Sequence, residues 1–189
     1  GEVLIDNANG GIVTIRVAAG GEDNDKKYAA SGAGIKTMNG VNNVRSKVTI
    51  TGLVDIVADG KTCNNEALSA VASTIEVGGG NIQAINGAWC AIRAYGEFVS
   101  ENTSIVNVNV LKDEAENIIG AGNNKTTIVG DFVTNGGMGT DGQINVGLNG
   151  KDSYWIGNYG DTRGYGVTQG MEGEVNLYMK NGASWTGFN

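Results

Sequence analysis

Two stretches of the chain repeat the same design, and this repeat constrains the fold more than any other feature. Gly142 to Asn158 (GQINVGLNGKDSYWIGN) and Gly173 to Asn189 (GEVNLYMKNGASWTGFN) each run from Gly into an alternating apolar strand, an Asn-containing turn, and then Ser and Trp. Trp155 aligns with Trp185 at an offset of 30 residues, and the strands align at 31. A unit of one strand, one turn and one short strand cannot bury its apolar face alone, so such units stack on one another.

Composition predicts an all-β chain. The 189 residues include 32 Gly and no Pro, and short apolar runs are separated by NG, GG and DG turns. Nine further strands are expected outside the two matched units: Val3–Asp6, Ile12–Ala18, Val44–Ile50, Leu53–Val57, Thr74–Val77, Asn81–Ile85, Trp89–Tyr95, Ser104–Leu111 and Thr126–Val133. One short helix is expected over Asn64 to Ser73, and Gly20 to Gly34 is expected to be a solvated loop.

Two architectures can hold many short strands joined by short turns. A β-sandwich joins antiparallel strands by hairpins. A parallel β-helix places each strand beside its equivalent one coil later, in the same direction, and the repeat favours this second fold. The alignment also places Asn145 against Asn176, whose amides can stack as a ladder. We therefore predict a single β-helix domain over residues 1–189 with loop insertions, of about seven coils at ~4.8 Å each.

Charge and residue content exclude several functions. The formal charge is −7, and no Lys/Arg cluster interrupts it, so nucleic-acid binding is not expected. The chain has no His, which excludes Ser-His and Cys-His triads and removes the usual transition-metal ligand. No run approaches ~18 apolar residues, so no transmembrane helix is expected, and the first residues do not resemble a signal peptide. No cofactor is predicted.

The two cysteines, Cys63 and Cys90, lie 27 residues apart, close to the repeat length. Stacking of neighbouring coils could therefore bring them together, and in an exported protein a disulfide closing such a loop stabilises by ~3 kcal/mol. The alternative is two small buried thiols, since free Cys is often found in cores.

The segment NLYMKNGASWTG, from Asn176 to Gly187, resembles the passenger repeat of Gram-negative autotransporters of the pertactin and AIDA type. In that repeat an alternating apolar strand leads through Asn-rich turn residues to a Ser-Trp-Thr-Gly corner. Ser184 to Gly187 match this corner well, whereas Ser153, Trp155 and Gly157 match it less closely. The two cysteines depart from the family pattern, and the sequence contains no translocator barrel.

This resemblance implies a right-handed parallel β-helix that is exported to the bacterial cell surface or the extracellular space. It also implies an adhesin or self-association module that binds glycan or protein on host or neighbouring cells. The chain would then be a fragment of a longer passenger, attached to the outer membrane through a region absent from this sequence.

One stretch overlaps a calcium-binding repeat. Gly136 to Ile144 (GGMGTDGQI) matches the nonapeptide GGxGxDxUx except at the apolar eighth position, where Gln143 stands. A calcium roll also needs tandem copies, and the chain has one. We interpret the stretch as a glycine turn and predict no metal site.

The residues expected to bind a ligand lie in an insertion that has no counterpart in the repeat. Tyr159 to Glu172 (YGDTRGYGVTQGME) combines Tyr159, Arg163 and Tyr165, with Trp155 just before it as possible support. Exposed aromatics beside a polar loop are typical of a carbohydrate or protein contact. For the tryptophans the alternative is a packing role at a corner or at the end of the stack.

Three functions are consistent with the sequence: a non-catalytic surface adhesin, a polysaccharide-active lyase or glycosidase, and a stalk. An enzyme needs grouped carboxylates, whereas Asp55, Asp131 and Asp141 are dispersed along the chain. The acid-rich runs Glu22–Asp25 and Asp113–Glu116 fall in expected loops. The adhesin is therefore preferred.

Overall fold

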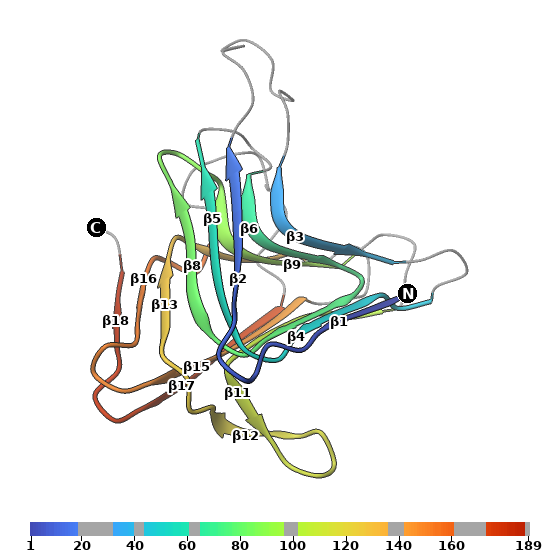
Figure 1. Cartoon of the computed structure of the whole chain (residues 1–189). Helices are drawn as coiled ribbons and strands as arrows, with labels where there is room; N and C mark the ends of the chain where they lie inside the picture. Colours follow the sequence, from blue (N-terminus) through green and yellow to red (C-terminus); the bar gives the residue numbers. More distant parts are fainter. Residues whose placement is uncertain are drawn as a thin grey trace.

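A computed structural model shows that the chain is built of β-strands joined by turns (Figure 1). No helix occurs among the residues that the structure describes, which are 1–18, 32–39, 44–60, 65–96, 102–135, 142–160 and 173–187. Within these ranges there is also no helix long and apolar enough to cross a membrane.

Sixteen of the strands form three parallel sheets, which we call sheets A, B and C. Sheet A contains β1 (Glu2–Ile5), β4 (Lys47–Ile50), β7 (Thr74–Val77), β10 (Ser104–Val108), β15 (Gly142–Asn149) and β17 (Gly173–Lys180). Sheet B contains β2 (Ile12–Ala18), β5 (Leu53–Asp59), β8 (Gly80–Ile85), β13 (Thr126–Val129), β16 (Tyr154–Ile156) and β18 (Ser184–Thr186). Sheet C contains β3 (Ala33–Met38), β6 (Glu66–Val71), β9 (Cys90–Tyr95) and β14 (Phe132–Asn135).

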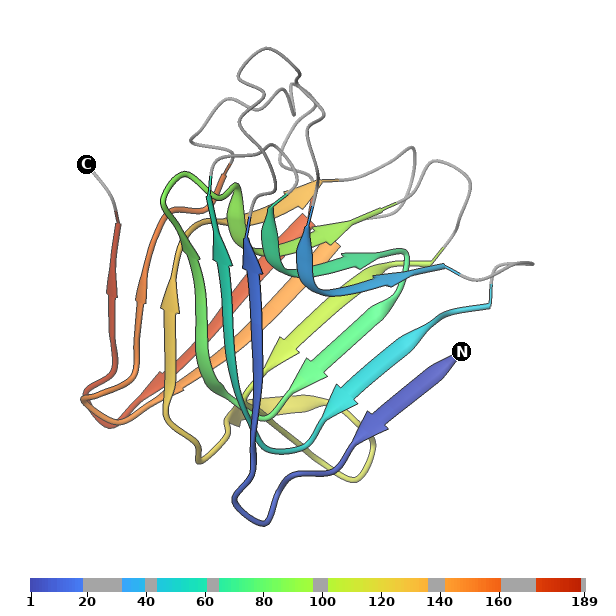
Figure 2. The same ribbon diagram turned by 45° about the horizontal axis from the view of Figure 1, so that its top comes forward.

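The chain visits the three sheets in turn. β1, β2 and β3 lie in sheets A, B and C, and β4, β5 and β6 return to the same sheets in the same order. Each strand pairs in parallel with its equivalent from the next circuit, and no sheet closes into a barrel (Figures 1 and 2). The predicted all-β class is therefore confirmed, and the antiparallel pairing of a sandwich is not observed in the three sheets.

The register confirms the repeat alignment made from sequence. β15 pairs with β17 so that Ile144 lies beside Val175 and Asn145 beside Asn176. β16 pairs with β18 so that Trp155 lies beside Trp185. Sheets A and B each contain six strands, fewer than the seven coils expected, in part because residues 110–121 leave the circuit to form the antiparallel hairpin β11 (Val110–Lys112) and β12 (Ile118–Ala121).

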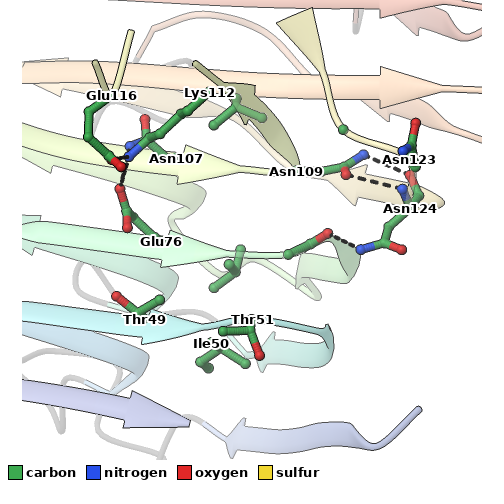
Figure 3. A pocket seen from close by; sticks show the side chains of 14 residues that line it. Thr49, Ile50, Thr51, Glu76, Asn107, Asn109, Lys112, Glu116, Asn123 and Asn124 are labelled. Carbon is green, nitrogen blue, oxygen red and sulfur yellow. Dashed lines mark hydrogen bonds and ion pairs between the residues drawn. The ribbon is translucent and has the colours of Figure 1, made fainter. Parts of the chain in front are cut away.

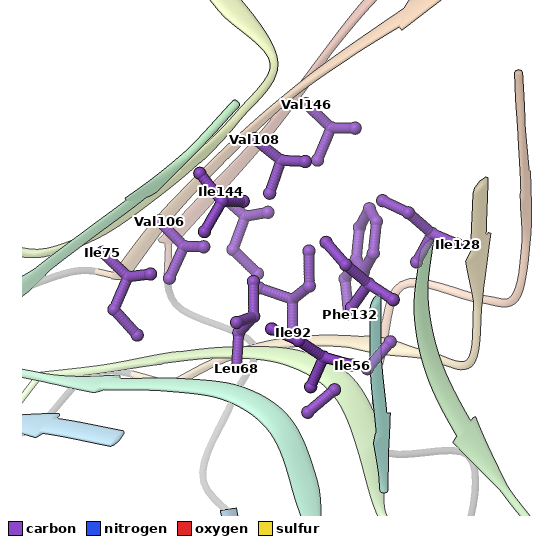
Figure 4. Close-up of a cluster of buried hydrophobic side chains, with 14 of the residues drawn as sticks. Ile56, Leu68, Ile75, Ile92, Val106, Val108, Ile128, Phe132, Ile144 and Val146 are labelled. Atoms are coloured by element: carbon purple, nitrogen blue, oxygen red, sulfur yellow. The ribbon is translucent and has the colours of Figure 1, made fainter. Parts of the chain in front are cut away.

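Alternate residues of each strand point into the space between the sheets and form one apolar core (Figure 4). In sheet A the inward row runs through Val48, Ile75, Val106, Ile144 and Val175, which are mutual neighbours by register. Ile75, Val106 and Ile144 are fully buried, and burying each of them contributes roughly 1.5–3 kcal/mol. Like side chains thus stack on like from one circuit to the next.

Three aromatic rings continue this core toward the C-terminal circuits. The rings of Phe132 and Trp155 are parallel within 3° at a centroid distance of 3.9 Å, and Trp155 and Trp185 follow at 5.2 Å and 9°. Trp155 is 1% exposed, whereas Trp185 is 52% exposed because it lies on the edge strand of sheet B.

Asn109 stands between β10 and the hairpin. Its backbone is left-handed (φ 49°), a conformation that Asn tolerates better than most residues. Its side-chain amide donates to the carbonyl oxygens of Asn124 (2.7 Å) and Gly147 (3.1 Å), and its side-chain oxygen accepts from the Asn124 amide (3.2 Å). These bonds join the two ends of the hairpin to sheet A.

Gly147 shows how closely the hairpin approaches the sheet. A Cβ at this position would lie 1.9 Å from the Asn109 carbonyl oxygen and 2.8 Å from the Ala121 Cα. Only glycine therefore allows β12 to lie against β15.

Three secondary-structure predictions were wrong. The expected helix over Asn64 to Ser73 is strand β6, because Glu66–Val71 is buried throughout between β3 and β9 and its backbone groups pair with both. The expected strand Ser104–Leu111 is interrupted at Asn109, and Thr126–Val133 is divided into β13 and β14 around Gly130. The predicted loop Gly20 to Gly34 lies mostly outside the described residues, and its end begins β3.

Candidate functional site

A row of polar side chains crosses the outer face of sheet A, on the side away from the core. Thr49, Glu76, Asn107, Asn145 and Asn176 are successive neighbours by register. Each amide donates to the next residue: Asn176 to Asn145 (3.0 Å), Asn145 to Asn107 (2.8 Å), and Asn107 to Glu76 (3.1 Å). The predicted pairing of Asn145 with Asn176 is confirmed and extends over four strands.

Glu76 is the charged residue of this row, and it pairs with two lysines. The Lys47 ammonium contacts its Oε2 atom at 2.7 Å, and Lys112 from the hairpin contacts its Oε1 atom. Partial burial alone would raise the pKa of Glu76, but the hydrogen bonds from Lys112, Lys47 and Asn107 outweigh it and lower the pKa below its ordinary value. Glu76 is therefore a carboxylate at neutral pH.

Lys112 connects the hairpin to the sheet. Besides Glu76 it binds Glu116, four residues further on, at 3.0 Å. Burial would lower the pKa of Lys112, but the bonds to Glu76 and Glu116 raise it above the ordinary value. The ammonium therefore stays charged.

The hairpin and the outer face of sheet A enclose a groove, which we call the sheet-A groove (Figure 3). Its larger part measures about 490 Å³ and its smaller part about 310 Å³, and both are lined by Glu76, Asn107, Lys112 and Glu116. Asn123 and Asn124 border the larger part at the corner where the chain enters sheet B. The lining combines amide, hydroxyl and charged groups with aliphatic side chains, among them Val110 in the larger part and Ile118 in the smaller.

Sheet B carries a second polar row on its outer face. Arg16 binds the Asp55 carboxylate, Asn81 donates to Asp55 at 2.7 Å, and Thr127 donates to Asn81 at 3.1 Å. The hydrogen bonds from Arg16 and Asn81 lower the pKa of Asp55. A pocket of about 440 Å³ lies over this row, with Lys125 in its lining.

The pKa shifts of Glu76 and Asp55 are opposite to the shift that a general acid needs. A general acid at neutral pH needs a carboxyl group with a raised pKa, whereas the hydrogen-bond and ion-pair partners of Glu76 and Asp55 lower theirs. Within the described ranges, no three His, Cys, Asp or Glu side chains are grouped so that they could hold a metal ion. The calcium-like stretch at residues 136–141 lies outside those ranges.

The structure describes two of the four predicted ligand-binding residues, Tyr159 and Trp155. Tyr159 is 41% exposed, and its hydroxyl contacts the Thr134 hydroxyl at 2.6 Å and donates to the Gly173 carbonyl at 3.3 Å. Trp155 instead lies in the core, where its indole donates to the Gly130 carbonyl at 2.9 Å, so it presents no ring face to a ligand. Arg163 and Tyr165 lie outside the described residues.

Trp89 fits the predicted packing role, whereas Trp185 on the edge strand of sheet B is half exposed. Trp89 is buried beside Cys90 and Val133, with the Arg93 guanidinium 4.6 Å above its ring. Cys90 is buried, and Cys63 lies outside the described residues, so the disulfide stays a prediction.

The sequence analysis missed the sheet-A groove. Glu76 and Lys112 are 36 residues apart, and the sequence pattern around Lys112 predicts a strand followed by an acidic loop rather than the hairpin that brings Lys112 to Glu76. Two residues of opposite charge at outward-facing strand positions about one circuit apart are the sequence pattern that indicates such a groove.

Comparison of the chain with protein-family models, with curated proteins and with solved structures gave no match in any of the three.

Proposed function

We propose that the chain is a right-handed parallel β-helix that acts as a non-catalytic binding module on the bacterial cell surface. The solenoid is supported by the order of the strands. Among the described residues, the first four circuits pass through sheets A, B and C and the last two through sheets A and B, and each circuit lies in register on the one before. The right hand follows the resemblance of Asn176 to Gly187 to autotransporter passengers.

The observation that carries the binding function is the lining of the sheet-A groove. The groove is open, its amides are fixed by the ladder, and its central carboxylate is held by two lysines. Fixed donors and acceptors on a rigid sheet bind a polar ligand with little loss of conformational entropy.

The cellular part of the proposal comes from the resemblance. An adhesin of this class is exported, binds glycan or protein on host or neighbouring cells, or associates with copies of itself, and is attached to the outer membrane through a further region. The insertion with Tyr159, Arg163 and Tyr165 remains a second proposed contact, beside the sheet-A groove.

The proposal is tested by applying the purified chain to a glycan array and to cultured host and bacterial cells, and by measuring attachment by fluorescence. We expect saturable attachment to at least one surface. In parallel, polysaccharides that bind are incubated with the chain and assayed for new reducing ends and for unsaturated products. Attachment to no surface would refute the binding function, and depolymerisation would show that the chain is an enzyme.

The insertion is tested separately. Tyr165→Ala should weaken attachment by roughly thirtyfold if this residue is a central contact, since such aromatics contribute 2 kcal/mol or more. Deletion of residues 161–169 with full retention of attachment would place the contact elsewhere.

A further inference from the structure

The smaller part of the sheet-A groove carries an excess of positive charge in an acidic protein. Three cationic side chains, Arg45, Lys47 and Lys112, line it with two carboxylates, Glu76 and Glu116, whereas the whole chain has a charge of −7. We propose that this part of the groove binds the carboxylate of an acidic oligosaccharide built of hexuronic acid units. This inference rests on the proposed function and specifies its ligand class.

Arg45 and Lys47 are the groups available to a ligand anion. Arg45 is exposed, its Nη2 atom donates to the Thr103 carbonyl, and no carboxylate pairs with it in the described part of the chain. Lys47 uses one of its three ammonium donors on Glu76 and keeps 37% of its side chain exposed. Lys47 is the first residue of β4, Arg45 lies two positions before the strand, and both line the smaller part of the groove.

The partners of these cations hold them without neutralising the site. Glu76 binds Lys47 through one oxygen and Lys112 through the other, so a single carboxylate is shared by two ammonium groups. Glu116 compensates only Lys112, and it is 77% exposed. The positive charge of Arg45 thus remains for the ligand, and a guanidinium binds a carboxylate in a bidentate manner.

The larger part of the groove provides the groups that a sugar chain needs beyond its carboxylate. Thr49, Asn107 and Asn124 border it, and amides and hydroxyls both donate to and accept from sugar hydroxyls. The two parts, about 490 and 310 Å³, fall in the size range of small-molecule sites and share a border at Glu76 and Lys112. A chain of a few sugar units can therefore span both parts.

The charge pattern favours a sugar chain that places one of its carboxylates in the smaller part of the groove over a polyphosphate. A nucleic-acid backbone carries a charge every few ångströms and requires many cations along its path. The groove has one excess positive charge, and the rest of the chain is acidic. A single carboxylate among hydroxyls matches this distribution.

The test is isothermal titration calorimetry of the purified chain with tetramers of galacturonate, glucuronate and mannuronate, each compared with its methyl ester. The ester keeps every hydroxyl and removes the charge. We expect at least one acid to bind roughly tenfold or more tightly than its ester, and to weaken as salt is added. Arg45→Gln and Lys47→Gln should each weaken this binding roughly tenfold.

Lys125→Gln is the matched control, because it removes the same charge from the pocket on sheet B. It should leave the affinity unchanged, and circular dichroism checks that all three variants fold. Binding that is equal for acid and ester, or that survives Arg45→Gln in a folded protein, would overturn the inference.

The two proposals fail in different ways. Attachment of the chain to cells or arrayed glycans without binding of any uronate tetramer would leave the binding module in place and reject the ligand class. Binding of an acidic peptide in preference to the tetramers would also reject it. Attachment to no surface and no binding of the tetramers would reject both proposals.

Discussion

Replacing Trp155 or Trp185 by Ala provides a matched test of how the stacked core is stabilised. The two residues occupy the same register position, and each indole donates one hydrogen bond to a backbone carbonyl, to Gly130 at 2.9 Å and to Gly157 at 3.0 Å. They differ in burial, with 1% and 52% of the residue exposed.

The structure sets the expected magnitudes. Trp155 loses the whole benefit of a buried ring stacked against two others, so Trp155→Ala should lower the free energy of unfolding by about 3–5 kcal/mol. Trp185 is half exposed and stacks on one face only, so Trp185→Ala should cost about half as much, roughly 2 kcal/mol.

Urea unfolding followed by far-UV circular dichroism measures both losses, each as the shift in midpoint multiplied by the slope m. The slope should stay constant between variants. Equal losses for the two variants, or a larger loss for Trp185→Ala, would refute the argument that burial within the stack determines the contribution of each ring.

Four further predictions concern other positions. The pKa of Glu76 is lowered in the folded chain, so its contribution to stability is present above the unfolded pKa of ~4.3 and is lost as pH falls through the lower folded value. The stability of the wild type should therefore decline more between pH 7 and pH 3 than the stability of Glu76→Gln. Parallel curves of stability against pH, measured by urea titration, would contradict this. Asn109→Ala should destabilise the protein by about 1 kcal/mol more than Asn109→Gly, because both variants lose the side-chain hydrogen bonds but only Ala strains the left-handed backbone. Equal urea midpoints for the two variants would show that the backbone at residue 109 is not strained. Gly147→Ala should destabilise by several kcal/mol, since its Cβ would overlap the Asn109 carbonyl, and near-native stability would mean that the hairpin does not lie so close to the sheet. Non-reducing digestion and mass spectrometry should find the Cys63 and Cys90 peptides linked, and alkylation of both thiols in the native protein would reject the disulfide.

The parallel stacking could be predicted because the evidence for it is local and repeated. Ile144 and Val175, and Asn145 and Asn176, stand at matching positions of two similar segments, so the alignment itself predicts the register. Alternation along each segment then assigns the core face, and the amide ladder follows from the outward positions.

The groove could not be predicted from the same evidence. Alternation continues unbroken through Asn107 and Asn109, and nothing in the residue types shows that Asn109 adopts a left-handed backbone and sends the chain outward. Strand β6 was mistaken for a helix because a fully buried strand loses its alternation of polar and apolar residues. In both places tertiary contacts, rather than local preference, determine the conformation.

The hairpin also has a consequence for how this chain can vary. It leaves the circuit at Asn109 and rejoins it at Asn124, and the pairing of β10 with β15 and of β8 with β13 continues without any change of register. The length and the sequence of the exposed turn at residues 113–117 can therefore change while the scaffold keeps its geometry. A foreign loop grafted between Lys112 and Ile118 should therefore be displayed over sheet A, while Lys47, Glu76 and Asn107 keep their places on the scaffold.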